Sequence, residues 1–504
     1  MKATYWLIAA IVIAASWLPV ERVQAQSEDL NAQAVELHRQ GRYREAIPIA
    51  TQALEQAEAQ FGPEHRVTAQ ALNNLALLYQ SMGRYEDALP LYRRALAICE
   101  QVVGLEHPDT ALTLNNLAAL HGLMGRYGDA LPLIGQALTI RGKAFGWEHP
   151  DTAASLNHLA DLQQSMGLYE NALPVVTQSL VVREKVLGSE HPDTATSLHS
   201  LAVLYQLMGR YEDALPLFER AVRIREKTLG LEHPDTAVSL NHLADLHHAM
   251  GRSEDALALI SRALGVRRKV FGDIHPHTAA TVDSLAWLYQ SLGRYDEALR
   301  HYSGALTVRE KVLGYEHPHT AISSNSLAWL YQSLGRYDDA ERFYKRSLAI
   351  REKALGWEHP DTAATLDSLA WLYQTLGQLD DALDGYRRSL AIREKVLGRE
   401  HPDTVTTVNS LAALYQAMGR HDESLPLFLR ALETRERTLG SQHLLTAISL
   451  NGLAALYASM GRYDDALLSC RRAVRIVYVT DISDTSSLSD FPKRYSRWKN
   501  RYLQ

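Results

Sequence analysis

Ten histidines stand 42 residues apart in this chain, at positions 65, 107, 149, 191, 233, 275, 317, 359, 401 and 443. Eleven glycines, from Gly41 to Gly461, repeat at the same spacing. Each stretch between them varies one unit, which is clearest in residues 189–230 as SEHPDTATSLHSLAVLYQLMGRYEDALPLFERAVRIREKTLG. A fixed period of this size indicates a repeat array, in which one unit buries its apolar face only when neighbours stack on it. We therefore expect one elongated solenoid.

Within each unit, the apolar residues follow the spacing of two consecutive helices. Leu72, Leu75 and Ala76 fall at i, i+3 and i+4, so they share one face of the first helix. Gly83 interrupts this pattern and supplies the backbone freedom that a tight turn needs. A second apolar run at helical spacing follows it. The sequence predicts an all-α fold of about eleven antiparallel helix pairs over residues 28–478.

The same positions carry a resemblance to a known repeat family. They are Leu72, Leu75, Ala76, Tyr79, Gly83, Tyr85, Ala88, Tyr92 and Ala95. Together they resemble the signature of the tetratricopeptide repeat (TPR), read without a gap. The 42-residue length, with EHPDTA in the connector and RALxIREKVLG closing the second helix, is similar to the kinesin-light-chain type. The resemblance implies a right-handed superhelical solenoid, a TPR array, that serves as an interaction module.

Composition limits the classes of partner and anchor. Hydrophobic residues make up 46% of the chain and charged residues 22%, as in ordinary globular proteins. The net charge of −6 argues against a nucleic-acid partner, which requires a basic surface. No apolar run inside the array approaches the thickness of a bilayer. Cys99 and Cys470 lie nearly nine repeats apart, so we expect two free thiols.

The N-terminus has the layout of a secretory signal peptide. A charged start at Met1 and Lys2 precedes an apolar stretch and the small-residue pattern that ends at Ala25. We predict a signal peptide over residues 1–25, cleavage after Ala25, and a periplasmic or extracellular protein. The alternative is an uncleaved anchor, although the apolar stretch is short for a membrane span.

No pattern in the chain predicts catalysis, a metal site or a cofactor. Stacked repeats place equivalent histidines roughly 8–10 Å apart, too far to share one zinc ion. Since Pro follows most of these histidines, we assign them to the connector and the helix start. His242, His247 and His248 lack an acidic or cysteine partner at ligand spacing, and we expect surface histidines. The chain has no P-loop, GxSxG or HExxH motif. We expect a non-catalytic protein.

The candidate binding residues lie on the first helix of each pair, opposite the packing face. The resemblance implies that this face lines a concave groove for extended peptides. The candidates, ten, six and three residues before the glycines, are Asn73, Asn115, Asn157, Asn241, Asp283, Trp287, Gln290, Asn325, Trp329, Gln332, Asp367, Trp371, Gln374 and Asn409. The amides can pair with a peptide backbone; alternatively, they bond to the neighbouring helix and fix the superhelix. The tryptophans anchor a ligand; alternatively, they are echoes of a recent duplication, or they pack between helices.

The chemistry of these positions narrows the expected ligand. TPR domains that hold a terminal carboxylate use Lys and Arg there, whereas the matching positions here hold mostly Asn, Trp and Gln with an occasional Asp. An acidic C-terminus is therefore a poor ligand. We expect an apolar or aromatic protein segment, with a basic residue facing Asp283 or Asp367. The alternative function is a recognition or regulatory arm for a separate catalytic chain, such as a CHAT-type protease.

The ends of the second helices and the C-terminal segment have distinctive sequences. The REK ends of the second helices are expected to form a solvated face with cations near helix C-termini. They are Arg183-Glu184-Lys185, Arg351-Glu352-Lys353, Arg393-Glu394-Lys395 and their equivalents in other repeats. After Tyr478 the period stops, and residues 479–504 form a tail. This tail is a capping helix, a disordered segment or the remnant of a lost domain.

Overall fold

The computed structural model describes residues 29–481, and this range is helical with no strand. Residues 29–39 form the first helix. The others are α2 (Tyr43–Phe61), α3 (Arg66–Ser81), α4 (Tyr85–Val102), α5 (Pro108–Leu123), α6 (Tyr127–Phe145), α7 (Pro150–Ser165), α8 (Tyr169–Leu187), α9 (Pro192–Leu207), α10 (Tyr211–Thr228), α11 (Pro234–Ala249), α12 (Ser253–Phe271), α13 (Pro276–Ser291), α14 (Tyr295–Val312), α15 (Pro318–Ser333), α16 (Tyr337–Leu355), α17 (Pro360–Thr375), α18 (Leu379–Val396), α19 (Pro402–Ala417), α20 (His421–Thr438), α21 (Leu444–Ser459) and α22 (Tyr463–Asp481). The predicted all-α solenoid of eleven helix pairs is confirmed.

The expected signal peptide and most of the expected tail lie outside the described residues. The last helix, α22, continues to Asp481, three residues beyond the point where the repeat period ends at Tyr478. The first three residues of the expected tail therefore continue this helix. Cys99 and Cys470 are both free thiols, as expected, and Cys99 is buried.

Each glycine of the comb makes the tight turn between the two helices of a pair. Gly83 has φ of +67°, a left-handed conformation that glycine adopts without strain. The backbone N–H of Arg84 donates to the carbonyl of Tyr79 at 2.9 Å, which satisfies one of the last carbonyls of α3. The guanidinium of Arg84 lies over the Tyr79 ring, 4.4 Å from its centroid. The turn is thus closed by local contacts that the repeated sequence supplies.

Each histidine of the comb caps the first helix of its pair, as predicted. The Nδ1 atom of His107 accepts the backbone N–H of Asp109 at 3.1 Å, and Pro108 follows as the first helical residue. The other nine comb histidines make the same hydrogen bond two residues ahead. Nδ1 is therefore unprotonated in these rings, and Nε2 carries the hydrogen.

The core runs continuously through the stack of repeats. Small residues such as Ala76 and Ala88 are completely buried where helices cross, and large ones such as Leu72 and Tyr92 fill the space between pairs. Each apolar cluster contains residues of at least two consecutive pairs, for example Ala160 to Ile224 across α7–α10. No pair has a complete core of its own, which is the property that defines a repeat array.

The REK triplets differ from the expected solvated face, because their arginines are buried. Arg225 is 6% exposed, and its Nη1 atom donates to the carbonyl of Asp235 at 3.0 Å and to the hydroxyl of Ser239 at 2.6 Å. Only the lysine of the triplet is solvated, and Lys227 pairs with Glu190 at 2.9 Å. The arginine ties the end of one pair to the first helix of the next. Helical spacing alone does not separate such an arginine from a surface one.

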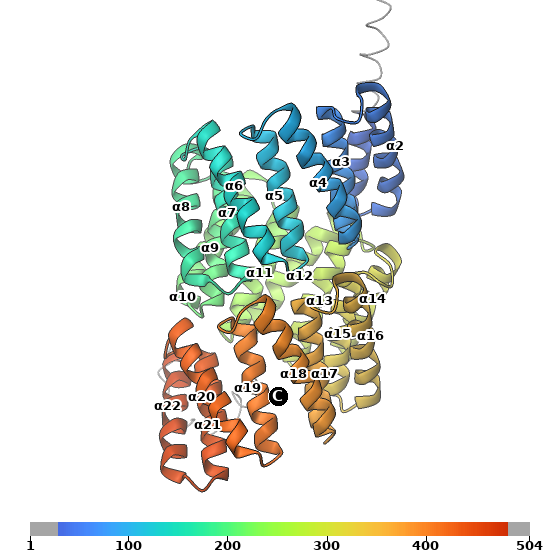
Figure 1. Ribbon diagram of the computed structural model, residues 1–504. Coiled ribbons are helices and arrows are strands. Elements are labelled where there is room, and N and C mark those ends of the chain that lie inside the picture. Colours follow the sequence, from blue (N-terminus) through green and yellow to red (C-terminus); the bar gives the residue numbers. More distant parts are fainter. Residues whose placement is uncertain (1–28, 482–504) are drawn as a thin grey trace, which may run out of the picture.

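The stacked pairs wind into a coil whose consecutive turns touch. Figure 1 shows α2–α10 in the upper turn and α14–α22 in the turn below. Three histidines cross between the turns, each to a carbonyl 236 residues earlier in the chain. The Nε2 atoms of His317, His359 and His401 donate to the carbonyls of Ser81, Leu123 and Ser165 at 3.2, 3.0 and 3.3 Å. Leu313 also packs into the apolar cluster around Ala50 and Leu54.

Glycine allows this approach of the two turns. A Cβ atom placed on Gly83 would lie 2.5 Å from Cδ of Pro318, closer than any real contact. An added Cβ atom would also be too close at the other four of the first five comb glycines. In each case the neighbour is the histidine 234 residues later, or the proline that follows it. The pairs are Gly41 and His275, Gly83 and His317, Gly125 and His359, Gly167 and His401, and Gly209 and His443. One coil of the superhelix therefore occupies between five and six repeats.

Candidate functional site

The inner wall of the coil is formed by the first helix of each pair. Consecutive first helices, such as α5 and α7 or α13 and α15, contact each other directly. In Figure 1 the helices at the edges of the coil, α2, α8, α16 and α22, are all second helices. In a curved two-layer stack the inner elements crowd together. The candidate residues therefore have to lie on the inner faces of α3, α5 and the later first helices if they contact a ligand in the groove.

The asparagines ten residues before each glycine bond to the next repeat. Asn115 is buried, and its Nδ2 atom donates to Oγ of Ser155 at 3.2 Å. Asn73 and Asn241 donate to Thr113 and Thr281 at 3.1 and 3.2 Å, and Asn157 and Asn409 accept from Ser197 and Ser449 at 3.3 and 3.1 Å. Asn325 is half-buried at the same position. These bonds are the internal struts that were the alternative to groove contacts.

The two aspartates at this position are already paired inside the protein. Asp283 contacts Arg309, and Asp367 contacts Arg393, each with N···O of 2.6 Å. The carboxylate side chains are only 12% and 19% exposed. Each also accepts a hydroxyl hydrogen bond from the next repeat. Because a buried arginine neutralises each charge, the expectation that a basic ligand residue faces Asp283 or Asp367 is wrong.

The glutamines three residues before the glycines are also tied to neighbouring side chains. Gln290 and Gln332 are each 6% exposed. Nε2 of Gln290 donates to Oγ of Ser333 at 3.2 Å, and Oε1 of Gln332 accepts from the Tyr344 hydroxyl at 3.1 Å. Gln374 is half-buried and accepts from a tyrosine in the same way. Their amide groups have limited freedom to bind a ligand.

The three tryptophans stand at the border between core and inner wall. Trp287, Trp329 and Trp371 are all half-buried. The ring of Trp287 meets His248 of α11 edge to face, with centroids 4.7 Å apart. His248 is itself buried, so the expectation that it is a surface histidine is wrong. One side of the Trp287 indole is thus fixed by the preceding inner helix, and the remainder stays accessible.

Two carboxylates occupy the same row as the tryptophans in earlier repeats. Asp161 and Asp245 stand six residues before their glycines, as Trp287 does. Burial raises the pKa of Asp161 to about 6 and that of Asp245 to about 7. Among the described residues no cation forms an ion pair with Asp245. Asp161 also lies near Arg183 and accepts a hydrogen bond from Ser200, whereas burial alone acts on Asp245. The sequence placed both in this row, but only their surroundings distinguish Asp245 from the paired Asp283 and Asp367.

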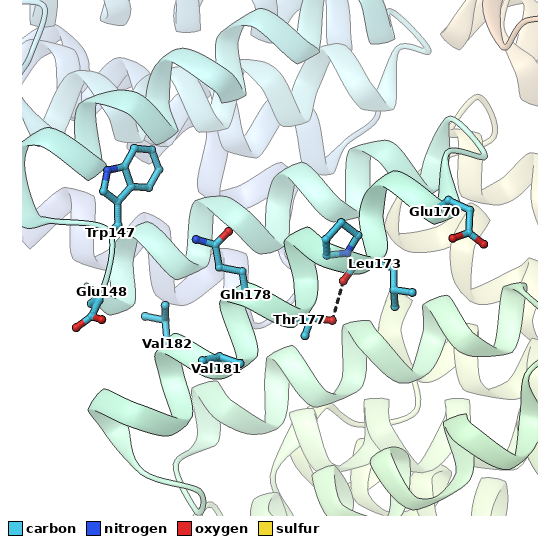
Figure 2. A pocket seen from close by; sticks show the side chains of 9 residues that line it. Trp147, Glu148, Glu170, Leu173, Thr177, Gln178, Val181 and Val182 are labelled. Carbon is cyan, nitrogen blue, oxygen red and sulfur yellow. Dashed lines mark hydrogen bonds between the residues drawn. The ribbon is translucent and has the colours of Figure 1, made fainter.

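A separate hollow of about 830 Å³ lies on the outside of the coil, against α8. Its lining residues are Trp147, Glu148, Glu170, Leu173, Pro174, Thr177, Gln178, Val181 and Val182. Figure 2 shows Trp147 and Glu148 at one end and Glu170 at the other. One cross-repeat ion pair found in the next repeat is absent at this hollow. Where Glu184 binds Arg220 at 2.7 Å in the next repeat, Gly142 and Gln178 stand here.

The described residues form neither a metal-binding cluster nor a membrane-spanning helix. No group of three His, Cys, Asp or Glu side chains in this part of the chain converges to hold a metal ion. No helix between residues 29 and 481 is both long and apolar enough to cross a membrane.

Several solved structures contain similar helical repeats. TPR-like repeats of a kinesin light chain from Podosopora anserina are 32% identical over 41% of this chain and 98% of that one, with a TM-score of 0.35. BtubC (BKLC) from P. vanneervenii is 24% identical over 47% and 94%, with a TM-score of 0.40. A Rap protein complexed with Competence and Sporulation Factor is 14% identical over 82% and 98%, with a TM-score of 0.49. No curated protein sequence matches the chain.

The family model of the tetratricopeptide repeat matches most of the chain. The matched stretches are residues 30–101, 68–143, 151–227, 199–269, 235–303, 278–353, 331–395 and 403–477. They span the whole of the described coil. TPR arrays are in general non-catalytic scaffolds for protein interaction. The chain belongs to the tetratricopeptide repeat family, with 42-residue repeats similar to those of kinesin-light-chain proteins.

Proposed function

We propose that the inner wall of the coil binds an extended protein segment that carries both apolar and basic side chains. The observation that supports this proposal is the row of residues six positions before the glycines. It passes from Asp161 and Asp245 to Trp287, Trp329 and Trp371. Large aromatic side chains anchor partners when their exposed part fits a pocket. An unpaired carboxylate gains a partner when a lysine or arginine approaches it.

The raised pKa of Asp245 gives this proposal a characteristic pH dependence. A basic ligand side chain binds the ionised carboxylate and stabilises it. With the pKa of the free protein at about 7, affinity for a basic segment should fall from about pH 8 to about pH 6. A purely apolar segment should show no such change. The fixed pairs of Asp283 and Asp367 do not contribute to this effect.

An array of synthetic peptides that vary in charge and aromaticity tests the proposal. We expect the purified chain to retain peptides that combine aromatic or aliphatic residues with Lys or Arg. The variant with Trp287, Trp329 and Trp371 all changed to Ala should lose at least about tenfold in affinity for them, as expected for the loss of anchor residues. Asp245→Asn should remove the pH dependence and leave aromatic selectivity intact.

The matched control is the pair Trp147→Ala and Trp357→Ala, because these indoles are 53% and 67% exposed on connectors. This variant should bind the peptides as the unmodified chain does. If it loses binding while the inner triple variant keeps it, the outer hollow at Trp147 is the binding site. If the triple variant loses its helical circular dichroism, the inner tryptophans act in the core and the proposal fails.

We further propose that the chain is exported, on the signal-peptide pattern that ends at Ala25. Intact mass measured on the exported fraction should correspond to a mature N-terminus at Gln26. Retention of Met1 in a soluble cytoplasmic fraction would contradict this.

A further inference from the structure

The two surfaces that meet between the turns of the coil recur at the two ends of the described coil, where no other described residue covers them. The first surface is the set of connectors that carry the comb histidines. Five of these connectors, at His275 to His443, rest on the preceding turn. The five earlier ones, which we call the head, are those of His65, His107, His149, His191 and His233. The side chains of the last four are 38–40% exposed.

The second surface is the set of glycine turns. The first five turns, at Gly41 to Gly209, receive the histidines of the next coil. The later turns of Gly293, Gly335, Gly377, Gly419 and Gly461, which we call the tail face, have no atom of residues 29–481 within 4 Å of an added Cβ, beyond their immediate chain neighbours. Among the tyrosines beside the turns, the extremes are Tyr85 at 7% and Tyr463 at 73% exposed, whereas Tyr295 and Tyr337 of the tail face are half-buried.

We propose that a second copy of this chain stacks its head on the tail face, so that the coil continues from one molecule into the next. The argument is the register of the contacts within one molecule, where a glycine turn meets the histidine 234 residues later. A copy placed eleven repeats further along the same coil keeps this register. It brings His65 to Gly293, His107 to Gly335, His149 to Gly377, His191 to Gly419 and His233 to Gly461.

The head and the tail face are different surfaces, so the contact is heterologous. A heterologous contact that follows a superhelix does not close on itself, and it generates open rods of increasing length. This distinguishes the proposal from a symmetric dimer, which would stop at two copies.

Charge opposes the contact between molecules, because both surfaces carry carboxylates. The head carries Asp109, Asp151, Asp193 and Asp235, and the tail face carries Asp296, Asp338, Asp380, Asp422 and Asp464. In the covered connectors, three of the positions equivalent to Asp109 hold His277, His319 and Leu445 instead. Repulsion between exposed carboxylates is screened by salt. The association should therefore strengthen as salt is added, in contrast to a contact held by ion pairs.

Sedimentation of the purified full chain over a range of protein and salt concentrations provides the test. A head variant, His149→Asp with His191→Asp, keeps side chains that cap the helices but adds charge to the head. A tail variant, Tyr463→Glu with Leu376→Glu, alters the exposed turns. The control is Leu429→Glu, an exposed residue on the outer helix α20. Circular dichroism checks that each variant is folded.

We expect the mass of the unmodified chain and of Leu429→Glu to rise with concentration without stopping at a dimer, and to rise further in salt. Each blocked variant alone should associate at least about tenfold more weakly. An equal mixture of the two should stop at a dimer, because only one good head and one good tail face remain. A monomer under all conditions, unchanged association of either variant, or a mixture that grows like the unmodified chain would overturn the proposal.

Discussion

The first five comb histidines and the last five have nearly the same sequence around them and different neighbours in space. All ten cap a helix through Nδ1. His107 leaves 39% of its side chain exposed, whereas His275 is fully buried against the preceding turn. The local sequence therefore determines the helix start, and the place of the repeat in the coil determines what else the ring contacts. Identical repeats acquire different energetics from their position alone.

The largest expected effect tests the helix packing that the first and second halves of the coil share. Ala76 and Ala328 are completely buried at equivalent positions, so Ala76→Asp and Ala328→Asp should each destabilise the protein by several kcal/mol through an unpaired buried carboxylate. Ser333→Asp, at an exposed position of the same helix as Ala328, should cost about 1 kcal/mol or less. Chemical denaturation measures all three. Equal shifts for Ala328→Asp and Ser333→Asp would refute the assignment of the packing face.

The next effect isolates the contact between turns. Gly83 and Gly335 have φ of +67° and +72°, so replacement by Ala strains both backbones alike. Only at Gly83 does the new methyl group meet a neighbour, Pro318 of the next turn. Gly83→Ala should therefore lower the free energy of unfolding by about 1–3 kcal/mol more than Gly335→Ala does. An equal loss in the two variants would show that the turns do not touch in solution.

A pH series sharpens the same contrast. Burial lowers the pKa of His317 from its ordinary value to about 4. The unfolded chain therefore binds a proton more readily than the folded one, and stability is complete above about pH 6.5 and falls as pH drops toward 4. His317→Asn should remove about 1–2 kcal/mol of that decline between about pH 7.5 and pH 5. An unchanged pH profile in this variant would contradict the buried environment of His317.

The smallest effect concerns a single hydrogen bond at neutral pH. Asn caps helices well, so His107→Asn should be nearly neutral. His317→Asn keeps the cap but loses the Nε2 bond to the Ser81 carbonyl, which should cost about 1 kcal/mol more. Thermal unfolding of the two variants at about pH 7.5 gives the difference. A larger loss in His107→Asn would reverse the comparison between the halves.

Much of the fold follows from residues that act within one repeat. The glycine turn, the histidine cap and the apolar spacing of Leu72 and Ala76 predict eleven helix pairs because their partners lie a few residues away. The contact between Gly83 and Pro318 could not be predicted in this way. It depends on the small rotation between pairs, accumulated over more than five repeats, and no single repeat encodes that sum.

The sequence predicted which residues lie on the inner wall better than it predicted which partners they contact. The spacing placed Trp287 on the correct helix face, and the structure leaves it half-buried. It did not show that Asp283 is paired with Arg309 while Asp245 is not, because the arginine comes from the neighbouring second helix. The buried arginines of the REK triplets were missed for a similar reason. Their partners lie ten and fourteen residues ahead, across a turn of the chain.

The contact between turns also changes how the molecule responds to force. A solenoid whose coils stand apart stretches like an open spring, since a pull only flexes the joints between neighbouring units. Here five glycine turns rest on five connectors, so the pitch cannot lengthen until that row of contacts separates. The coil should resist a small pull stiffly and then yield abruptly. Such a threshold is a mechanical property that none of its eleven nearly identical units has by itself.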